Sequence, residues 1–211
     1  MDKSVLWKLS YGMYAIGTLD EARPTGCIVN TVVQITSEEP IIAVSMNKNN
    51  FTYEAIKNTG KFAVSILSEQ ADQNAIAALG FASGRDKDKF SEDLFDFMYF
   101  DGMPVVKDKV SGYMVAEVVM MQETSTHMVI LARVTNTMNG VDIAPMTYKY
   151  YHDVIKGKAP KNAPTFQEEE TPAECWVCGV CGYVYEGDIT KEADDFVCPI
   201  CKQPKSVFKK K

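Results

Sequence analysis

Four cysteines near the end of the chain constrain its fold more than any other feature. They form two C-x-x-C pairs, Cys178–Cys181 and Cys198–Cys201, with sixteen residues between the pairs. Four thiolates complete the coordination of a tetrahedral metal ion without a histidine or a carboxylate. A C-x-x-C pair can fold as a tight turn whose later amides point at the sulfurs, and Gly182 lets the chain leave that turn with a positive φ. The spacing therefore predicts a closed metal site whose ligands are Cys178, Cys181, Cys198 and Cys201.

Cys175 forms an overlapping C-x-x-C pair with Cys178, so the choice of ligands depends on the residues that follow. Glycine and then Tyr-Val-Tyr follow Cys181, which favours Cys178 and Cys181 as ligands. Cys175 is then expected to be a reduced thiol near the surface. Cys27 stands alone on a strand pattern and is expected to be a small buried side chain. Ligand softness alone leaves iron and zinc equally suitable as the metal.

The residues around these cysteines resemble rubredoxin, the one-iron electron carrier, over residues 175–211. The resemblance is carried by C-x-x-C-G-Y-V-Y, D-D-F-V-C-P-x-C and P-K-x-x-F. It implies that the metal is iron and that four aromatic side chains keep water away from it: Tyr183, Tyr185, Phe196 and Phe208. Lys202 stands where the family usually has glycine, and we expect it to adopt a left-handed conformation at a cost of about 1 kcal/mol. The alternative is a zinc ribbon that only stabilises a small domain.

Composition and charge narrow the class of protein. The chain has 211 residues, of which 46% are hydrophobic and 24% charged, as in a globular protein of one or two domains. Its net charge of -6 and its pI near 5.0 argue against a nucleic-acid partner. No stretch has the length of a signal peptide's apolar segment or of a membrane span. We therefore expect a cytoplasmic protein with reduced cysteines and no membrane partner.

Before residue 155 the pattern predicts mainly strands. Two helices are expected, one over 52–58 and one over 71–79 that ends at Gly80. The two longest strand segments follow residue 112 and suggest adjacent antiparallel strands. The predicted fold is therefore mainly β, a barrel with flanking helices. The strand segments are rich in Val, Ile, Thr and Tyr and cover 12–19, 27–36, 40–47, 61–67, 113–123 and 127–138.

A boundary follows the barrel. Residues 156–174 contain three of the nine prolines and a run of three glutamates, and they show no apolar period. The predicted organisation is a barrel over residues 1–155, a linker over 156–174 and a metal domain over 175–211.

The candidate ligand site of the barrel is a polar turn before the first helix. The alternative is an ordinary helix cap at Asn50 or Thr52. The chain has no G-x-G-x-x-G and no P-loop motif, and His127 and His152 lack the Ser or Cys partner of a hydrolytic triad. Free N–H groups at a helix start bind anionic phosphate, and amide, hydroxyl and ammonium groups converge here from Asn47, Lys48, Asn49, Asn50 and Thr52.

Residues 5–155 resemble the flavin reductase-like, FMN-binding split barrel, through the segments Pro24–Pro40, Ser45–Thr52 and Gly84–Phe90. The resemblance implies a homodimer with FMN at the interface. Barrels of this kind fused to a rubredoxin tail are typical of the high-molecular-weight rubredoxins of anaerobic bacteria, which the whole chain resembles. In the family, the positions of Asn30, Thr31 and Gln34 line the flavin ring, those of Ser45 through Thr52 bind its phosphate, and that of Lys89 lies in a loop near the ring.

Taken together, the two resemblances imply an electron-transfer oxidoreductase. FMN takes up a hydride, whereas iron held by four thiolates takes up single electrons. The expected path runs from NAD(P)H through FMN to the iron, and then to an external acceptor such as a flavodiiron protein that reduces nitric oxide or oxygen. No acid–base side chain is expected to be catalytic. Two alternatives remain open: a carrier reduced by a separate NAD(P)H reductase, and a zinc-stabilised flavin-binding module.

Overall fold

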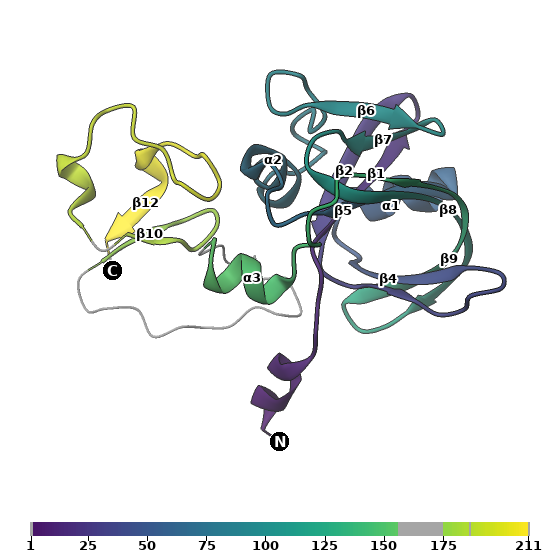
Figure 1. Ribbon diagram of the computed structural model, residues 1–211. Coiled ribbons are helices and arrows are strands. Elements are labelled where there is room, and N and C mark those ends of the chain that lie inside the picture. The colour runs from purple at the N-terminus through teal and green to yellow at the C-terminus, as the bar shows by residue number, and fades with distance from the viewer. Residues whose placement is uncertain (1, 156–174, 186, 211) are drawn as a thin grey trace.

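The computed structural model describes residues 2–155, 175–185 and 187–210. They form a barrel with its helices and a smaller lobe that contains the C-terminus (Figure 1). The linker predicted over 156–174 lies outside the described residues. The chain begins with a short 3-10 helix, η1 (Lys3–Lys8).

One antiparallel sheet of seven strands makes up the barrel, in the order β2-β1-β5-β8-β9-β4-β3. Figure 1 shows how strongly this sheet curves. The two longest strands, β8 and β9, are neighbours, as their sequence pattern predicts. The strands are β1 (Tyr14–Asp20), β2 (Arg23–Val29), β3 (Val32–Gln34), β4 (Ile41–Asn47), β5 (Lys61–Leu67), β8 (Val110–Glu123) and β9 (His127–Asn139).

The segment 27–36, predicted as a single strand, is in fact two strands. β2 ends at Val29, β3 begins at Val32, and the two lie at opposite ends of the sheet order. The chain therefore passes from one edge of the sheet to the other at Asn30 and Thr31. Local sequence could not reveal this break, because pairing with distant strands decides which edge a strand occupies.

In the part of the chain that the structure describes, three short helices accompany the sheet: α1 (Phe51–Thr59), α2 (Gln73–Phe81) and α3 (Tyr148–Asp153). Gly60 ends α1 in the left-handed conformation, with a φ of 67°. The prediction that Gly80 ends α2 is wrong, because the helix continues through Gly80 to Phe81 and the first extended residue is Ala82. α3 was not predicted. Each helix begins after a side chain that accepts a backbone amide hydrogen, namely Asn50, Asp72 and Thr147.

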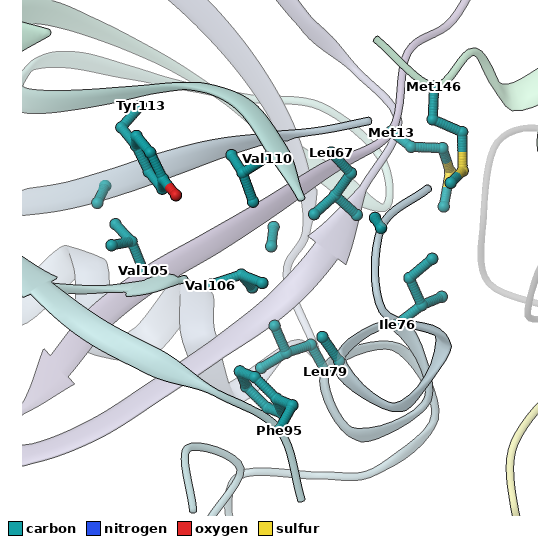
Figure 2. Close-up of a cluster of buried hydrophobic side chains, with 14 of the residues drawn as sticks. Met13, Leu67, Ile76, Leu79, Phe95, Val105, Val106, Val110, Tyr113 and Met146 are labelled. Carbon is teal, nitrogen blue, oxygen red and sulfur yellow. The ribbon is translucent and has the colours of Figure 1, made fainter. Parts of the chain in front are cut away.

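The main core lies between the sheet, α2 and a hairpin that the pattern did not predict. The hairpin consists of β6 (Phe97–Phe100) and β7 (Met103–Val106). Its strands are too short to show a clear period of two. Figure 2 shows side chains from all three sources meeting in this cluster, among them Leu67, Ile76, Leu79, Val105, Val106, Val110 and Tyr113, together with Phe95 from the loop before β6.

The C-terminal lobe is a small three-stranded sheet with two short 3-10 helices. Its strands, in the order β11-β10-β12, are β10 (Trp176–Cys178), β11 (Val184–Tyr185) and β12 (Phe208–Lys210). The helices are η2 (Ile189–Lys191) and η3 (Lys205–Val207). The structure thus confirms a mainly β fold with flanking helices and a small metal domain. Within the described ranges, no helix is long and apolar enough to cross a membrane.

Candidate functional site

The four predicted metal ligands meet inside the C-terminal lobe. Their Sγ atoms all lie within 4.8 Å of one another, and all four residues are buried. Two close sulfur pairs join the two knuckles: Cys178 to Cys201 at 3.6 Å and Cys181 to Cys198 at 3.5 Å. Four buried thiols converging on one point form a complete tetrahedral donor set that fits one iron or one zinc ion.

Each knuckle closes with the same backbone geometry. The amide of Gly182 donates to the carbonyl of Cys178 at 2.9 Å, and that of Lys202 donates to the carbonyl of Cys198 at 2.9 Å. Both residues are left-handed, with φ of 77° at Gly182 and 56° at Lys202. The predictions for both positions are therefore confirmed. Lys202 accepts a conformation that costs a non-glycine residue about 1 kcal/mol.

Backbone amides point at the sulfurs and favour their thiolate form. The amides of Ile200 and Cys201 donate to the Cys198 sulfur, and that of Tyr183 donates to the Cys181 sulfur. Hydrogen bonds from the neighbouring thiols, and then these amides, lower the pKa of Cys198 to about 2. The Cys181 thiol donates a hydrogen bond to the Cys198 sulfur, and because this bond holds the proton on Cys181 it raises the pKa of that thiol. A bound cation stabilises all four thiolates.

Aromatic rings cover one side of the cluster, as the resemblance implies. Phe208 is buried, and its ring lies 6.5 Å from that of Tyr183 and 6.0 Å from that of Phe196. The Phe196 ring lies 5.5 Å from that of Tyr185. Cys175 is not part of the metal cluster, as predicted, but the expectation that it lies near the surface is wrong. It is only 1% exposed, so the fold covers the start of the lobe.

A cavity of about 370 Å³ lies between the barrel, α1, α2 and the loop after α2. One part of its wall is apolar and includes Met13, Ile28 and Leu79, and another part is polar. This mixture suits a ligand with a flat aromatic ring and a charged tail. Six of the ten residues predicted to bind flavin line it, namely Asn30, Ser45, Asn47, Asn49, Asn50 and Lys89.

The polar wall is the start of α1. Asn50 caps this helix, its Oδ1 accepting the amide hydrogen of Thr52 at 3.0 Å, and Asn47 Oδ1 accepts the amide hydrogen of Asn49 at 2.9 Å. Arg85 fastens the loop after α2 to the same place: it donates to the Asn49 carbonyl at 3.2 Å and pairs with Glu54. The loop thereby closes over a helix start, where an anion is favoured.

Four predicted flavin residues are not in the lining of this cavity. Lys48 pairs with Glu123 at 2.5 Å and also donates to the Thr124 carbonyl, which directs its ammonium group toward the β8–β9 turn. The other three are Thr31, whose hydroxyl donates to Asn30, Gln34, whose amide donates to Thr36, and Thr52, which is buried beneath the helix start.

Lys89 is a buried cation in the cavity wall. It is 4% exposed, and its Nζ donates to the Leu79 carbonyl at 2.7 Å. Burial lowers its pKa to about 8. Cys27 lies nearby, fully enclosed, and burial raises the pKa of its thiol. Within the described ranges Lys89 forms no ion pair with a carboxylate, so an anionic ligand would supply its missing counter-charge.

Several cavity residues were not found from the sequence. His127 lines the wall although it was interpreted as an ordinary strand residue, and burial lowers its pKa, which favours the neutral imidazole. Phe81 and Tyr151 come from α2 and α3, and Val180 comes from the metal domain. These residues carry no local motif. Only the packing of distant segments brings them together.

The two candidate sites are therefore adjacent. Val180 lies between the ligands Cys178 and Cys181 and also lines the barrel cavity. Phe81 packs against the apolar cluster that contains the four cysteines. Burial raises the pKa of the Tyr151 hydroxyl, and the nearby thiolates of Cys181, Cys198 and Cys201 raise it further. Figure 1 shows the lobe on the side of the barrel where α2 and α3 lie.

Comparison with known proteins accounts for both parts of the chain. Residues 6–157 match the flavin reductase like domain. The chain belongs to the flavin reductase-like family. Residues 176–209 match the rubrerythrin, rubredoxin-like domain, so the four cysteines of this flavin reductase-like chain form a rubredoxin-type iron site. The barrel is correspondingly a flavin-binding reductase domain, and the family match does not distinguish FMN from FAD.

Relatives share this arrangement to different extents. The high molecular weight rubredoxin of Moorella thermoacetica is 37% identical over 99% of this chain and 99% of its own length. The NAD(P)H ferric-chelate reductase of Archaeoglobus fulgidus is 32% identical over 81% of this chain and 100% of its own. The flavin reductase of styrene monooxygenase from Pseudomonas putida has a TM-score of 0.59, with 19% identity over 68% of this chain and 88% of that structure. The last likeness concerns the fold alone. With both domains present, the chain is an electron-transfer oxidoreductase.

Proposed function

We propose that this chain oxidises NAD(P)H at a bound FMN and passes the electrons singly to the rubredoxin-type iron and on to an external protein. For that acceptor we propose a flavodiiron protein that reduces nitric oxide or oxygen. The observation that supports the path most directly is that Val180, from the first cysteine knuckle, lines the flavin cavity. Electron tunnelling falls steeply with distance, and a shared wall keeps the donor and acceptor sites close.

The chain's own residues would bind and orient the cofactor. FMN, when bound, takes up a hydride and releases single electrons, and a four-thiolate iron carries one electron at a time. The start of α1, with Asn47, Asn49 and Asn50, favours the phosphate, and the apolar wall favours the ring. Lys89 places positive charge in the wall. No side chain needs to move a proton, because the nicotinamide gives up a hydride.

An anaerobic stopped-flow experiment tests the path. The oxidised protein is mixed with NADH and, separately, with NADPH, and flavin and iron absorbance are followed. We expect the flavin to bleach first and the iron second. In Cys198→Ser, which lacks one iron ligand, the flavin should still bleach. Flavin released by acid should co-elute with FMN, and metal analysis should find one iron per chain.

Other outcomes would support the alternatives. If neither nicotinamide bleaches the flavin but a separate reductase reduces both centres, the chain is a carrier. If zinc fills the cysteine site, the chain is a flavin-binding module, and the proposed function is wrong. Consumption of nitric oxide by a purified flavodiiron protein, driven by NAD(P)H and this chain, tests the proposed acceptor.

We also propose that the chain forms a homodimer through the outer face of its sheet. The strand register places Val33, Ala43, Leu131 and Met120 side by side across β3, β4, β9 and β8. Val33 and Met120 are 52% and 50% exposed. An apolar row across four strands that is exposed at Val33 and Met120 and half-buried at Ala43 and Leu131 is typical of a protein interface. A second copy of the same face can pair with it isologously.

A further inference from the structure

We propose that Lys202 positions the iron domain over the flavin cavity by facing an acidic groove of the barrel, and that this docked arrangement is the one that transfers electrons. The inference deepens the proposed function and rests on it. It assigns a role to a residue that iron binding does not explain. Lys202 would act as a positioning residue, since it is neither one of the four clustered cysteines nor part of the cavity lining.

The first contact between the two domains is apolar. Phe81, at the end of α2, packs against the cluster that contains the cysteines. Val180 reaches the cavity wall, where Phe81 and Tyr151 also lie. Tyr151 is 3% exposed and feels the charge of three of the four thiolates. This contact brings the two domains together, but a single non-directional apolar contact does not by itself fix their relative orientation.

The second contact is electrostatic and lies elsewhere on the barrel. A separate groove runs beside the starts of α2 and β8, and Lys202 is the metal-domain residue in its lining. The barrel side of the groove carries one cation, Lys109, and six carboxylates, those of Glu69, Asp72, Glu92, Asp93, Asp96 and Asp108. A cation presented to such a groove is attracted by its summed field.

The two contacts involve both cysteine knuckles. Val180 lies inside the first knuckle, and Lys202 directly follows the second. Each knuckle therefore holds the barrel at a different place, and two separated contacts define an orientation that a single one does not. Charge complementarity typically sets the register and the encounter rate of an interface more than its raw affinity.

The backbone at Lys202 supports a role for its side chain. Its φ is 56°, and Gly182 takes the same conformation at the equivalent place in the other knuckle, where a side chain is absent. A strained non-glycine residue persists where the surroundings determine it, often at functional sites. The iron site needs only the backbone there, through the amide that donates to Cys198. What the lysine adds over glycine is a cation beside the acidic groove.

The attraction acts over a distance. Lys202 is exposed and forms no ion pair within 4.0 Å with another residue that the structure describes. Exposed charges that act at longer range are screened by salt. Iron reduction in the full chain should therefore slow as ionic strength rises, and the slowing should depend on the charge at position 202.

The experiment compares charge variants of the full chain with iron and flavin bound. Lys202→Glu should slow iron reduction by flavin by roughly tenfold or more, because it replaces attraction by repulsion. Lys202→Arg should keep the rate and the salt dependence. The matched control is Lys209→Glu, which makes the same change of charge on β12, outside the lining of the groove. It should leave the rate within about twofold, the scale of an ordinary surface change.

A compensating change and a second measurement complete the test. Asp93→Lys in the Lys202→Glu background restores opposite charges across the groove and should recover much of the rate. The iron spectrum and flavin reduction should be unchanged throughout. Hydrogen exchange of the last turn of α2, which holds Phe81, should rise in Lys202→Glu and not in Lys209→Glu. If iron fails to incorporate in Lys202→Glu, Asp93→Lys alone repels Lys202 from the barrel side, and it should show the same slowing and the same rise in exchange.

Two failures can be distinguished. If NAD(P)H reduces the flavin of the unmodified chain but never its iron, the proposed function is wrong, and the exchange measurement still decides whether Lys202 docks the domain. If the iron is reduced, but Lys202→Glu and Lys209→Glu match in rate, salt dependence and exchange, the role proposed for Lys202 is overturned.

Discussion

Replacing Lys89 by methionine should make the flavin-free barrel more stable at neutral pH and weaken flavin binding. Lys89 is 4% exposed, and burial lowers its pKa from 10.5 to about 8. One pKa unit corresponds to about 1.4 kcal/mol, so the ammonium group costs the flavin-free fold about 3 kcal/mol at pH 7. Methionine fills similar volume without charge, although it leaves the Leu79 carbonyl without its donor at a cost of about 1 to 3 kcal/mol.

The pH dependence separates these two effects. Between pH 8 and pH 10.5 the unfolded chain keeps the proton on Lys89, whereas the folded, flavin-free barrel has lost it. The free energy of unfolding must therefore rise with pH in that window. In Lys89→Met this rise should be absent. An anionic ligand favours the protonated lysine, so flavin affinity should fall as pH rises through about 8 in the unmodified chain and stay flat in the variant.

Urea unfolding of the flavin-free protein, followed by far-ultraviolet circular dichroism at pH 7 and pH 10, measures the first effect. Flavin titration by fluorescence across the same range measures the second. Lys57→Met, on the exposed surface of α1, is the matched control. Equal pH slopes for the unmodified chain and Lys89→Met, in both stability and affinity, would show that Lys89 is not the buried cation of this site.

Three further changes test the two sites and the interface. Cys181→Ser should lose the iron and its red colour, because removing one thiolate leaves the metal under-coordinated, whereas Cys175→Ser should stay red. The reverse result would overturn the ligand assignment. Asn50→Asp keeps the cap of α1 but puts a carboxylate at the start of the helix, where it repels a phosphate. Flavin should therefore bind at least tenfold more weakly, by roughly 1.4 kcal/mol, while the melting temperature of the barrel stays unchanged. Unchanged flavin affinity would exclude this helix start as the phosphate site. Met120→Glu should shift a dimer toward monomer in sedimentation velocity, and an unchanged dimer would exclude the outer sheet face.

The metal centre could be predicted from the sequence because its ligands are nearly contiguous. Within each knuckle the turn that places the two sulfurs is local, and the left-handed residues Gly182 and Lys202 follow the second cysteine of each pair. Spacing together with the residues that follow Cys181 therefore identified the four cysteines. The burial of Cys175 escaped this reasoning, because the neighbours that cover a residue can come from anywhere in the chain.

The barrel cavity could be predicted only in part. The polar turn of Asn47 to Asn50 is a local feature that marks a helix start, and the structure puts it in the cavity wall. Lys48 lies in the same turn, but its ammonium group pairs with Glu123, which is 75 residues away in the sequence. No local pattern contains that partner.

The sequence by itself thus determined the two domains, the four metal ligands and the helix start that favours an anion, since each depends on residues within a few positions of one another. Tertiary structure alone decided that the chain crosses between opposite sheet edges at Asn30, which side chains bury Lys89, and that Val180 and Phe81 lie where the cysteine cluster and the barrel cavity adjoin. These features depend on contacts between segments far apart in the chain. Such contacts follow from strand pairing and packing of the whole molecule, which local propensity and spacing do not encode.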